Sequence, residues 1–259
     1  MPNDPSPPAA RRTVTSETIE VLHNRVSVRK YSDKPVDDAT IDAVLEAAFR
    51  APTSSNIQSY TVIVVRDEET KKQLSVTTGN QRHVAETPVF LAFCADITRI
   101  EDALKRNGHT IDDNNMEMGL VASIDASLAG MAAYLAADSL GLKGVMIGGV
   151  RNNPVEVARI LDMPPRVYCV FGMCLGWPDQ APPQKPRMNF DSMVHRERYD
   201  RTAALGALDD YDAELSAHYT SKGVETTPDS WTHDMDRKFN PPLRDKLREH
   251  LKTLGFDFR

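Results

Sequence analysis

Several features common in metal-binding, secreted and membrane proteins are missing from this 259-residue sequence. It has only three cysteines (Cys94, Cys169 and Cys174), which lie in apolar runs without CxxC or Cys/His spacing. This pattern disfavours a zinc site and predicts buried, reduced thiols and no bound metal. The N-terminus has no apolar run of the kind found in signal peptides, so we expect a cytoplasmic protein.

An excess of basic charge is also missing. The 31 Lys and Arg residues are outnumbered by 37 Asp and Glu, and the formal net charge is -6 at pH 7. This balance disfavours a general nucleic-acid surface but allows a local basic patch for a small phosphate. The sequence also has no internal repeat, P-loop, GxGxxG or GxSxG motif. These absences remove the commonest signatures of nucleotide-binding and serine-hydrolase folds.

What the sequence does have is one long apolar stretch, over residues 116–142. It contains no Lys or Arg, and its three acids are Glu117, Asp125 and Asp138. Apolar residues fall on almost every side at helical spacing, which predicts a helix buried nearly all round and ended by Gly141. A transmembrane helix is disfavoured because two of the acids would lie within or at the edge of the span. We therefore expect a central core helix, of a kind that two subunits can share.

Residues 143–151 follow this helix and predict a short apolar strand that ends in Gly148 and Gly149. A glycine pair at the end of a strand is typical of a turn or of a close approach of the backbone to another group. A buried helix followed by such a strand is a suitable frame for a cofactor site.

Two polar segments carry the strongest candidate ligand groups. In residues 25–31, strand-like alternation would place Arg25, Ser27 and Arg29 on one face, where two guanidinium groups and a hydroxyl suit a phosphate. The alternative is an exposed basic strand edge. Residues 50–58 form a loop rich in donors and acceptors, which suits a ribityl chain or a heteroaromatic edge. The alternative there is an ordinary Ser/Asn turn.

The remaining pattern alternates helices and strands. Residues 1–15 are rich in proline and predict a disordered tail, followed by one domain over residues 16–259. Ser16 and Asp37 can each cap a helix. We expect helices after these two residues and at 68–76, 98–115 in part, 154–161, 209–222 and 243–254. We also expect a buried strand at 61–65, an apolar strand at 89–95 and a strand at 167–176.

Taken in order, seven short segments resemble one family. The chain is similar to the nitroreductase and flavin reductase family, in particular its NADPH-dependent oxygen-insensitive nitroreductases and bacterial FMN reductases. The segments are RVSVR (25–29), DKP (33–35), APTSSNIQ (51–58), GNQRHV (79–84), MIGGVRNN (146–153), FGMCLGWP (171–178) and KPR (185–187).

This resemblance implies a fold and an assembly. The fold would be α+β and nitroreductase-like, a mixed, mainly antiparallel sheet flanked by helices with a long buried central helix. The protein would be an intertwined homodimer with FMN at the interface and C-terminal helices wrapping the partner subunit.

The resemblance also implies roles for individual residues. Arg25 and Ser27 would hold the FMN phosphate together with Lys185 and Arg187, and Arg29 would lie near the ribityl or pyrimidine end. Hydrogen bonds to the ribityl chain or isoalloxazine edge would come from Ser54, Ser55, Asn56 and Gln81. The backbone near flavin N5 and O4 would come from Met146, Ile147, Gly148 and Gly149. His83 is interpreted as structural.

The implied activity is two-electron transfer from NADPH or NADH through FMN to a small aromatic oxidant: a nitro compound, a quinone or free flavin. The flavin carries this chemistry, so no catalytic side chain is expected. Two alternatives stay open: a reductase supplying reduced flavin to a monooxygenase, and a non-catalytic flavin store or sensor. Relatives often have an Arg where this chain has Val26, and an Arg in the NADPH-phosphate loop where it has Lys222. Because Lys is the less directional phosphate partner, use of NADH is also expected.

Overall fold

The computed structural model describes residues 14–111 and 116–258. It divides into two compact units, one comprising Met1–Pro182 with Lys246–Arg259 and the other comprising Pro183–Asp245. Residues 1–13 of the predicted tail and residues 112–115 lie outside the described residues. One domain over residues 16–259 remains a prediction about how the two units combine in the assembled protein.

A four-stranded sheet forms the centre of the first unit. Its strands are β1 (Tyr60–Val65), β2 (Val89–Asp96), β3 (Lys143–Ile147) and β4 (Val167–Gly176), in the order β1-β2-β4-β3. All three pairings are antiparallel, which confirms the predicted fold class. β2 is buried along its whole length, but β1 is an edge strand on which Val64 is 40% exposed. The strand predicted at residues 61–65 is therefore confirmed, but it is only partly buried in the single chain.

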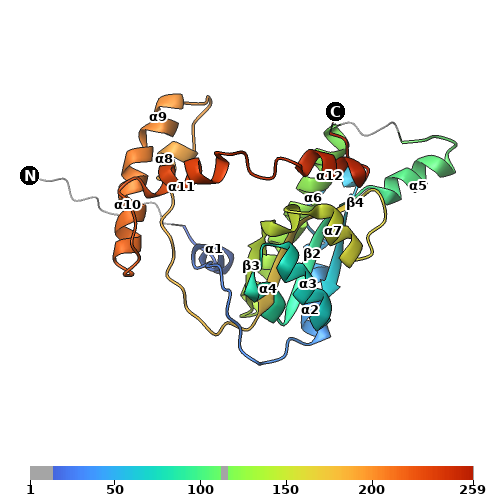
Figure 1. Ribbon diagram of the computed structural model, residues 1–259, viewed down its shortest axis with the longest axis horizontal. Coiled ribbons are helices and arrows are strands. Elements are labelled where there is room, and N and C mark those ends of the chain that lie inside the picture. The colour runs from blue at the N-terminus through green and yellow to red at the C-terminus, as the bar shows by residue number, and fades with distance from the viewer. Residues whose placement is uncertain (1–13, 112–115, 259) are drawn as a thin grey trace, which may run out of the picture. The chain divides into compact units, whose positions relative to one another are not determined.

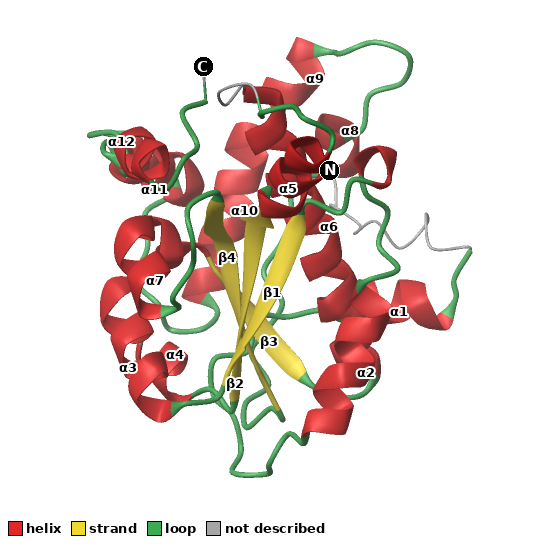
Figure 2. Ribbon diagram, turned by 90° about the vertical axis from the view of Figure 1, so that its right-hand side faces the viewer, coloured by secondary structure: helices red, strands yellow, loops and turns green. Residues whose placement is uncertain are grey.

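Helices cover both faces of this sheet. Figure 2 shows α2 (Asp38–Ala48) and α6 (Met116–Ser139) on one side, with α3 (Glu68–Thr77), α4 (Arg82–Glu86) and α7 (Pro154–Ile160) on the other. Each face has its own buried apolar cluster, one centred on Phe93 and Met173 and the other on Phe90 and Cys174. The two clusters use alternate residues of the same strands, as the pleat of a sheet requires. All three cysteines are free and buried.

The central helix α6 is buried on only one side of the single chain. Its buried side consists mainly of small residues, including Ala122, Ala126, Ala129 and Ala133. On the other side the large apolar side chains at positions 120, 124, 128 and 131 are exposed, and Ile124 is 55% exposed. The prediction of burial nearly all round was therefore wrong for a single chain. We call the exposed set Leu120, Ile124, Leu128 and Met131 the α6 stripe.

By length and composition, α6 is the one helix among the described residues that could cross a membrane. Its packing assigns it to the protein core instead. The helix lies against α2 and the sheet, and the side chain of Asp125 is fully buried within this packing. A carboxylate buried among protein donors has no counterpart on a lipid-facing helix.

Three further helices belong to the first unit. Ser16 caps α1 (Glu17–His23) by accepting a hydrogen bond from the Ile19 N–H, as predicted. α5 (Thr98–Arg106) lies on the surface, and α12 (Leu247–Thr253) begins at Leu247 rather than at residue 243. Leu251 of α12 joins a third apolar cluster with Tyr168 of β4, so the C-terminal segment returns to the sheet.

The second unit is helical. It contains α8 (Phe190–Met193), α9 (Arg201–Gly206), α10 (Leu208–Thr220) and α11 (Ser230–Phe239), which are labelled in Figure 1. The buried carboxylate of Asp212 on α10 accepts hydrogen bonds from the N–H groups of Trp231 (2.6 Å) and Thr232 (2.9 Å). This contact caps the start of α11 and fixes it against α10.

Candidate cofactor-binding site

The segment that carries the predicted phosphate ligands lies along the outer edge of β3. Residues 25–29 form no strand, contrary to the predicted alternation, but the N–H of Val28 donates to the carbonyl of Gly144 over 3.0 Å. The Tyr134 hydroxyl of α6 donates to the Val26 carbonyl over 2.8 Å. With Val28 only 1% exposed, the segment is anchored through its valines, as the apolar face of the pattern predicted.

The two arginines of this segment are placed by their neighbours. The Arg25 guanidinium lies 5.7 Å from the centre of the Tyr134 ring. Burial lowers the pKa of His83 on α4, and the positive charge of Arg29 lowers that pKa further. Arg25 therefore lies beside the central helix, and Arg29 lies near the start of α4, directly after Gln81.

β3 ends in a 3-10 turn, Gly148–Arg151, as the glycine pair predicted. At Gly149 an added Cβ would lie 2.5 Å from the Thr78 carbonyl oxygen and 2.6 Å from Nε2 of Gln81. Gln81 Nε2 in turn donates to that same carbonyl over 2.7 Å. Glycine is therefore required here by the loop that carries Gln81, a cause that the sequence did not reveal.

Met146 and Ile147, the two residues before this turn, face opposite ways. Met146 is 38% exposed, whereas the Ile147 side chain is buried in the apolar core. The side chain of Ile147 is therefore not available to a ligand, and its predicted backbone role stays a prediction.

The third predicted segment is a tight loop before β1. Ser54, Ser55 and Asn56 form a short 3-10 turn with exposed side chains. Ser55, Asn56 and Gln58 have positive φ angles of 47°, 56° and 55°. Non-glycine residues rarely adopt this conformation, and they persist in it only where the surrounding structure holds them.

These groups do not all meet within one chain. Arg25, Arg29, Gln81 and Gly149 gather around β3, which is one edge of the sheet, whereas Ser54–Asn56 precedes β1 at the opposite edge. β1 and β3 are three strand spacings apart in the order β1-β2-β4-β3. At about 4.8 Å per spacing, the two edge strands lie about 14 Å apart. A single chain therefore presents two half-sites at opposite edges of its sheet.

The remaining predicted residues belong to the second unit, and all three are exposed. Lys185 Nζ donates to the Tyr219 hydroxyl over 2.8 Å, near the end of α10. Lys222 lies two residues beyond the end of α10, and its N–H donates to the Tyr219 carbonyl over 2.9 Å. Arg187 donates through Nη1 to the Pro186 carbonyl over 3.1 Å. The predicted phosphate ligands Lys185 and Lys222 are thus both close to Tyr219.

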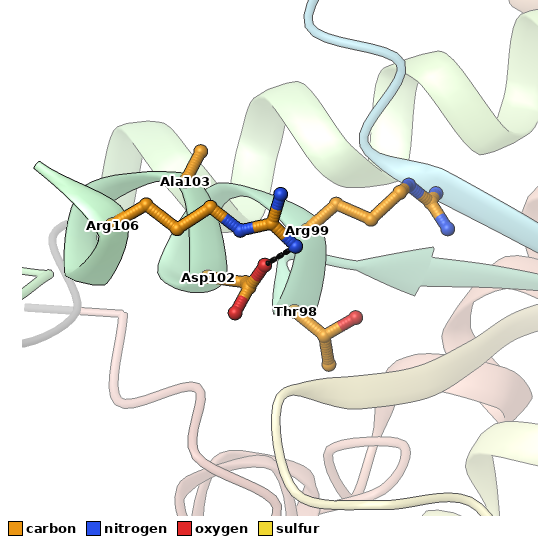
Figure 3. Close-up of a pocket in the computed structure, with 5 residues that line it drawn as sticks. All are labelled: Thr98, Arg99, Asp102, Ala103 and Arg106. Atoms are coloured by element: carbon orange, nitrogen blue, oxygen red, sulfur yellow. Dashed lines mark ion pairs between the residues drawn. The ribbon is translucent and has the colours of Figure 1, made fainter.

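A shallow pocket lies on α5, outside all of these groups (Figure 3). It is lined by five residues of that helix, including Arg99, Asp102 and Arg106. Asp102 and Arg106 form an ion pair of 2.7 Å, and Arg99 extends away from them toward the segment that leads into β1. Both cations are therefore engaged with protein groups rather than directed at a common ligand.

Sequence reasoning missed two residues that shape the loop before β1. Asp125 accepts hydrogen bonds from the loop's N–H groups, and Arg99 donates to its carbonyl groups. A signal existed for Asp125: an acid within a helix without basic residues needs partners from elsewhere in the chain. No comparable signal existed for Arg99, which is one of several charged residues on a surface helix.

Comparison with known proteins assigns this geometry to a family. The model of the nitroreductase family matches residues 22–177, and the model of its C-terminal domain matches residues 185–259. The chain belongs to the nitroreductase family. This confirms the predicted family, and the boundary between the two matches lies close to the boundary between the two structural units.

Relatives of known sequence and structure extend over nearly the whole chain. An oxygen-insensitive NADPH nitroreductase of Salmonella typhimurium is 34% identical over 94% of this chain and all of its own. An FMN reductase [NAD(P)H] of Bacillus subtilis is 35% identical over 93% of this chain and 98% of its own. The solved structure of B. megaterium NfrA2 superposes with a TM-score of 0.90 at 34% identity, covering 95% of this chain and all of that one.

Proposed function

We propose that this protein is an FMN-dependent NAD(P)H oxidoreductase that reduces small aromatic oxidants by two electrons. It is an oxidoreductase of the nitroreductase family, and FMN is its cofactor. Nitroaromatics, quinones and free flavin are the proposed acceptors. The observation that carries the proposal is the pair of half-sites at the two sheet edges, which hold the donor groups that FMN requires.

The residues of the described chain fit FMN chemically. Arg25 and Ser27 offer a cation and a hydroxyl for the phosphate, and we assign Lys185 and Arg187 of the second unit to the same group. Arg29 and Gln81 would face the ribityl or pyrimidine end. We assign the backbone of residues 146–149 to flavin N5 and O4, and at Gly148 no Cβ stands in the way of that approach.

A second copy of this chain completes the site. FMN would bind between Arg25, Arg29, Gln81 and Gly149 of one subunit and Ser54–Asn56 of the other. The α6 stripe supports this arrangement because four large apolar side chains exposed along one helix favour burial against another subunit. The second unit would then contact the partner subunit through its helices. We further propose that this homodimer works in the cytoplasm.

The proposed reaction requires little chemistry from the protein's side chains. When bound, FMN would supply the hydride chemistry, and the nicotinamide nucleotide and the oxidant would occupy the same place beside it in turn. The protein would orient the two reactants in turn, and a cation or backbone donor at the pyrimidine end would stabilise negative charge there. No side chain needs to act as acid, base or nucleophile.

Lys222 is the proposed partner of the NADPH 2′-phosphate. It lies exposed at the end of α10, and the following residues include Glu225 and no further cation before Pro228. A single exposed lysine beside an acid discriminates weakly between NADPH and NADH. We therefore propose that both nucleotides serve as donors. The Bacillus subtilis relative carries both nucleotides in its name.

The acceptor could also be free FMN released in reduced form to a monooxygenase. This second candidate is favoured by relatives named FMN reductase as well as nitroreductase. Comparing turnover of free FMN with turnover of a nitro compound separates the two activities.

The first test is the absorbance spectrum of the purified protein, followed by anaerobic addition of NADPH and, separately, NADH. We expect a flavin band near about 450 nm that bleaches with either nucleotide. In Lys222→Ala, bleaching by NADPH should slow while bleaching by NADH is unchanged. Bound flavin that neither nucleotide reduces would instead favour a store or sensor. No flavin after reconstitution with FMN would overturn the proposal.

A further inference from the structure

The carboxylate of Asp125 ties both ends of the loop before β1 to the central helix. Its Oδ1 accepts a hydrogen bond from the N–H of Ser54 over 3.0 Å. Its Oδ2 accepts from the N–H of Ser59 over 3.1 Å and from the Ser59 hydroxyl over 2.8 Å. The Asp125 side chain is fully buried, so these contacts are shielded from water and are stronger than surface contacts.

The loop between these two anchor points needs external support. Three of its residues, Ser55, Asn56 and Gln58, have left-handed backbone conformations that side chains other than glycine disfavour. Within the loop, the Ile57 N–H donates to the Ser54 carbonyl over 2.8 Å, and Gln58 Nε2 donates to the carbonyl (3.3 Å) and Oδ1 (3.2 Å) of Asn56. These contacts do not attach the loop to the rest of the chain, so the anchors at its two ends fix it in place.

Arg99 of α5 contacts the same loop through its carbonyl groups. Its Nη2 donates to the carbonyls of Gln58 (3.1 Å) and Tyr60 (2.5 Å), and its Nη1 pairs with Asp96 over 3.2 Å. Figure 3 shows this side chain reaching toward the loop. The carboxylate of Asp125 thus accepts from N–H groups of this segment, and the guanidinium of Arg99 donates to its carbonyl groups.

The packing of α6 explains why aspartate can serve here. Ala126 and Ala129, one and four residues further along the helix, pack against Tyr60 at the start of β1. These small side chains bring the helix backbone close to the loop, so the short side chain of Asp125 reaches the loop's N–H groups. Ile124, the preceding residue, belongs to the exposed α6 stripe.

We propose that Asp125 is a positioning residue for FMN. It holds Ser54, Ser55 and Asn56 in the one loop shape that presents their donors to the flavin, without touching the flavin itself. Because Asp125 lies on the helix that carries the α6 stripe, it also links the loop shape to the subunit interface. The assignment rests on the proposed function, since it takes this loop as one half of the FMN site.

The deciding variant is Asp125→Asn, which has one acceptor oxygen in place of two. The amide oxygen serves the two donors of Ser59, and the amide NH2 then faces the N–H of Ser54, which loses its partner. We expect FMN to bind on the order of tenfold to a hundredfold more weakly, the cost of one unsatisfied buried donor. At saturating FMN, kcat should remain within about threefold of wild type, because no reacting atom is touched.

Ser59→Ala is the matched control. It removes the hydroxyl contact but leaves both backbone anchors in place, so FMN affinity should change less than about threefold. Amide hydrogen exchange gives a readout independent of flavin. In Asp125→Asn without FMN, exchange should accelerate at Ser54 and not at Ser59. Failure of wild type to bind FMN would overturn the proposed function, whereas unchanged exchange at Ser54 would overturn the anchoring by Asp125.

Wild-type FMN affinity in folded, dimeric Asp125→Asn would overturn the proposal. Arg99→Gln provides a second route should Asp125→Asn not fold, because the Arg99 side chain is 55% exposed and its replacement spares the core. It removes the carbonyl anchors and should weaken FMN binding severalfold. Unchanged FMN affinity in Arg99→Gln would show that FMN binding does not depend on the carbonyl anchors that Arg99 provides.

Discussion

At the scale of single residues, Gly149 and Gly148 differ in what surrounds them. A Cβ at position 149 would lie 2.5 Å from a backbone oxygen, that of the buried Thr78. At position 148 the nearest atom would be Nη2 of Arg151 at 3.3 Å, the end of a flexible side chain. The two glycines are adjacent in the sequence and look equivalent there, but only the second is fixed by packing.

We therefore predict that Gly149→Ala destabilises the protein by about 1–3 kcal/mol, the usual cost of overpacking a rigid site. It should also weaken FMN binding, because the turn after β3 and Gln81 move apart. Chemical denaturation and a flavin titration measure the two effects. Gly148→Ala is the control, and its stability should be within about 0.5 kcal/mol of wild type. Equal destabilisation by both variants would contradict this assignment.

A second prediction concerns His83, whose Nε2 is buried without a hydrogen-bond partner among the described residues. Burial is the main cause of its lowered pKa, and the charge of Arg29 adds to it. Arg29→Ala should therefore raise the pKa of His83, though not above the unperturbed value of about 6.5. Titration of the imidazole by NMR measures this shift. A pKa that stays the same would mean that Arg29 lies elsewhere.

The sign of the accompanying pH effect follows from linkage. A histidine whose pKa is lowered on folding binds fewer protons in the folded state than in the unfolded state. Its contribution to stability is present above the unfolded pKa and is lost as the pH falls below about 6.5 toward the folded pKa. The free energy of unfolding should fall less steeply over this range in Arg29→Ala than in wild type.

At the scale of elements, the α6 stripe carries the prediction about assembly. Ile124→Glu places a charge at the centre of four exposed apolar side chains. If a second subunit covers them, the variant should be monomeric and should lose bound FMN, because burying an unpaired charge is strongly unfavourable. Sedimentation velocity and the flavin spectrum test this. Val76→Glu on α3, where Val76 is 66% exposed, is the control and should change neither.

How far the elements could be predicted depended on local signals. The apolar run at 167–176 predicted both ends of β4 correctly, and Asp37 predicted the start of α2. A buried strand and a capped helix both have strong sequence patterns. The burial of β1 and of α6 was overestimated for a different reason. Apolar composition predicts that a side chain will be covered, but it does not say whether the cover comes from the same chain.

The candidate site shows the same limit. Donor-rich segments and the family resemblance led to Arg25, Gln81 and the loop at 51–58, but not to the separation of these groups between two sheet edges. That separation depends on the strand order β1-β2-β4-β3, which no local pattern encodes. The roles of Asp125 and Arg99 were hidden for the same reason, since both act on a segment at least 39 residues away.

At the scale of the whole molecule, the two half-sites allow a test by mixing defective subunits. One variant, Arg25→Ala with Ser27→Ala, loses the phosphate ligands near β3. The other, Ser54→Ala with Asn56→Gly, loses donors of the loop before β1. Glycine is chosen at position 56 because it adopts the left-handed conformation of Asn56 without strain. Each variant alone should form dimers that bind little FMN, since both of their sites contain one defective half.

A mixed dimer behaves differently if each site takes one half from each subunit. One of its sites then combines both defects, while the other combines the two intact halves and binds FMN normally. Random mixing makes about half of the dimers mixed, so bound flavin and reductase activity should recover to about a quarter of wild type. If each site lay within one chain, every site would keep one defect and mixing would restore nothing. The fraction of bound flavin after co-refolding therefore distinguishes a shared site from a self-contained one, even for variants that are individually inactive.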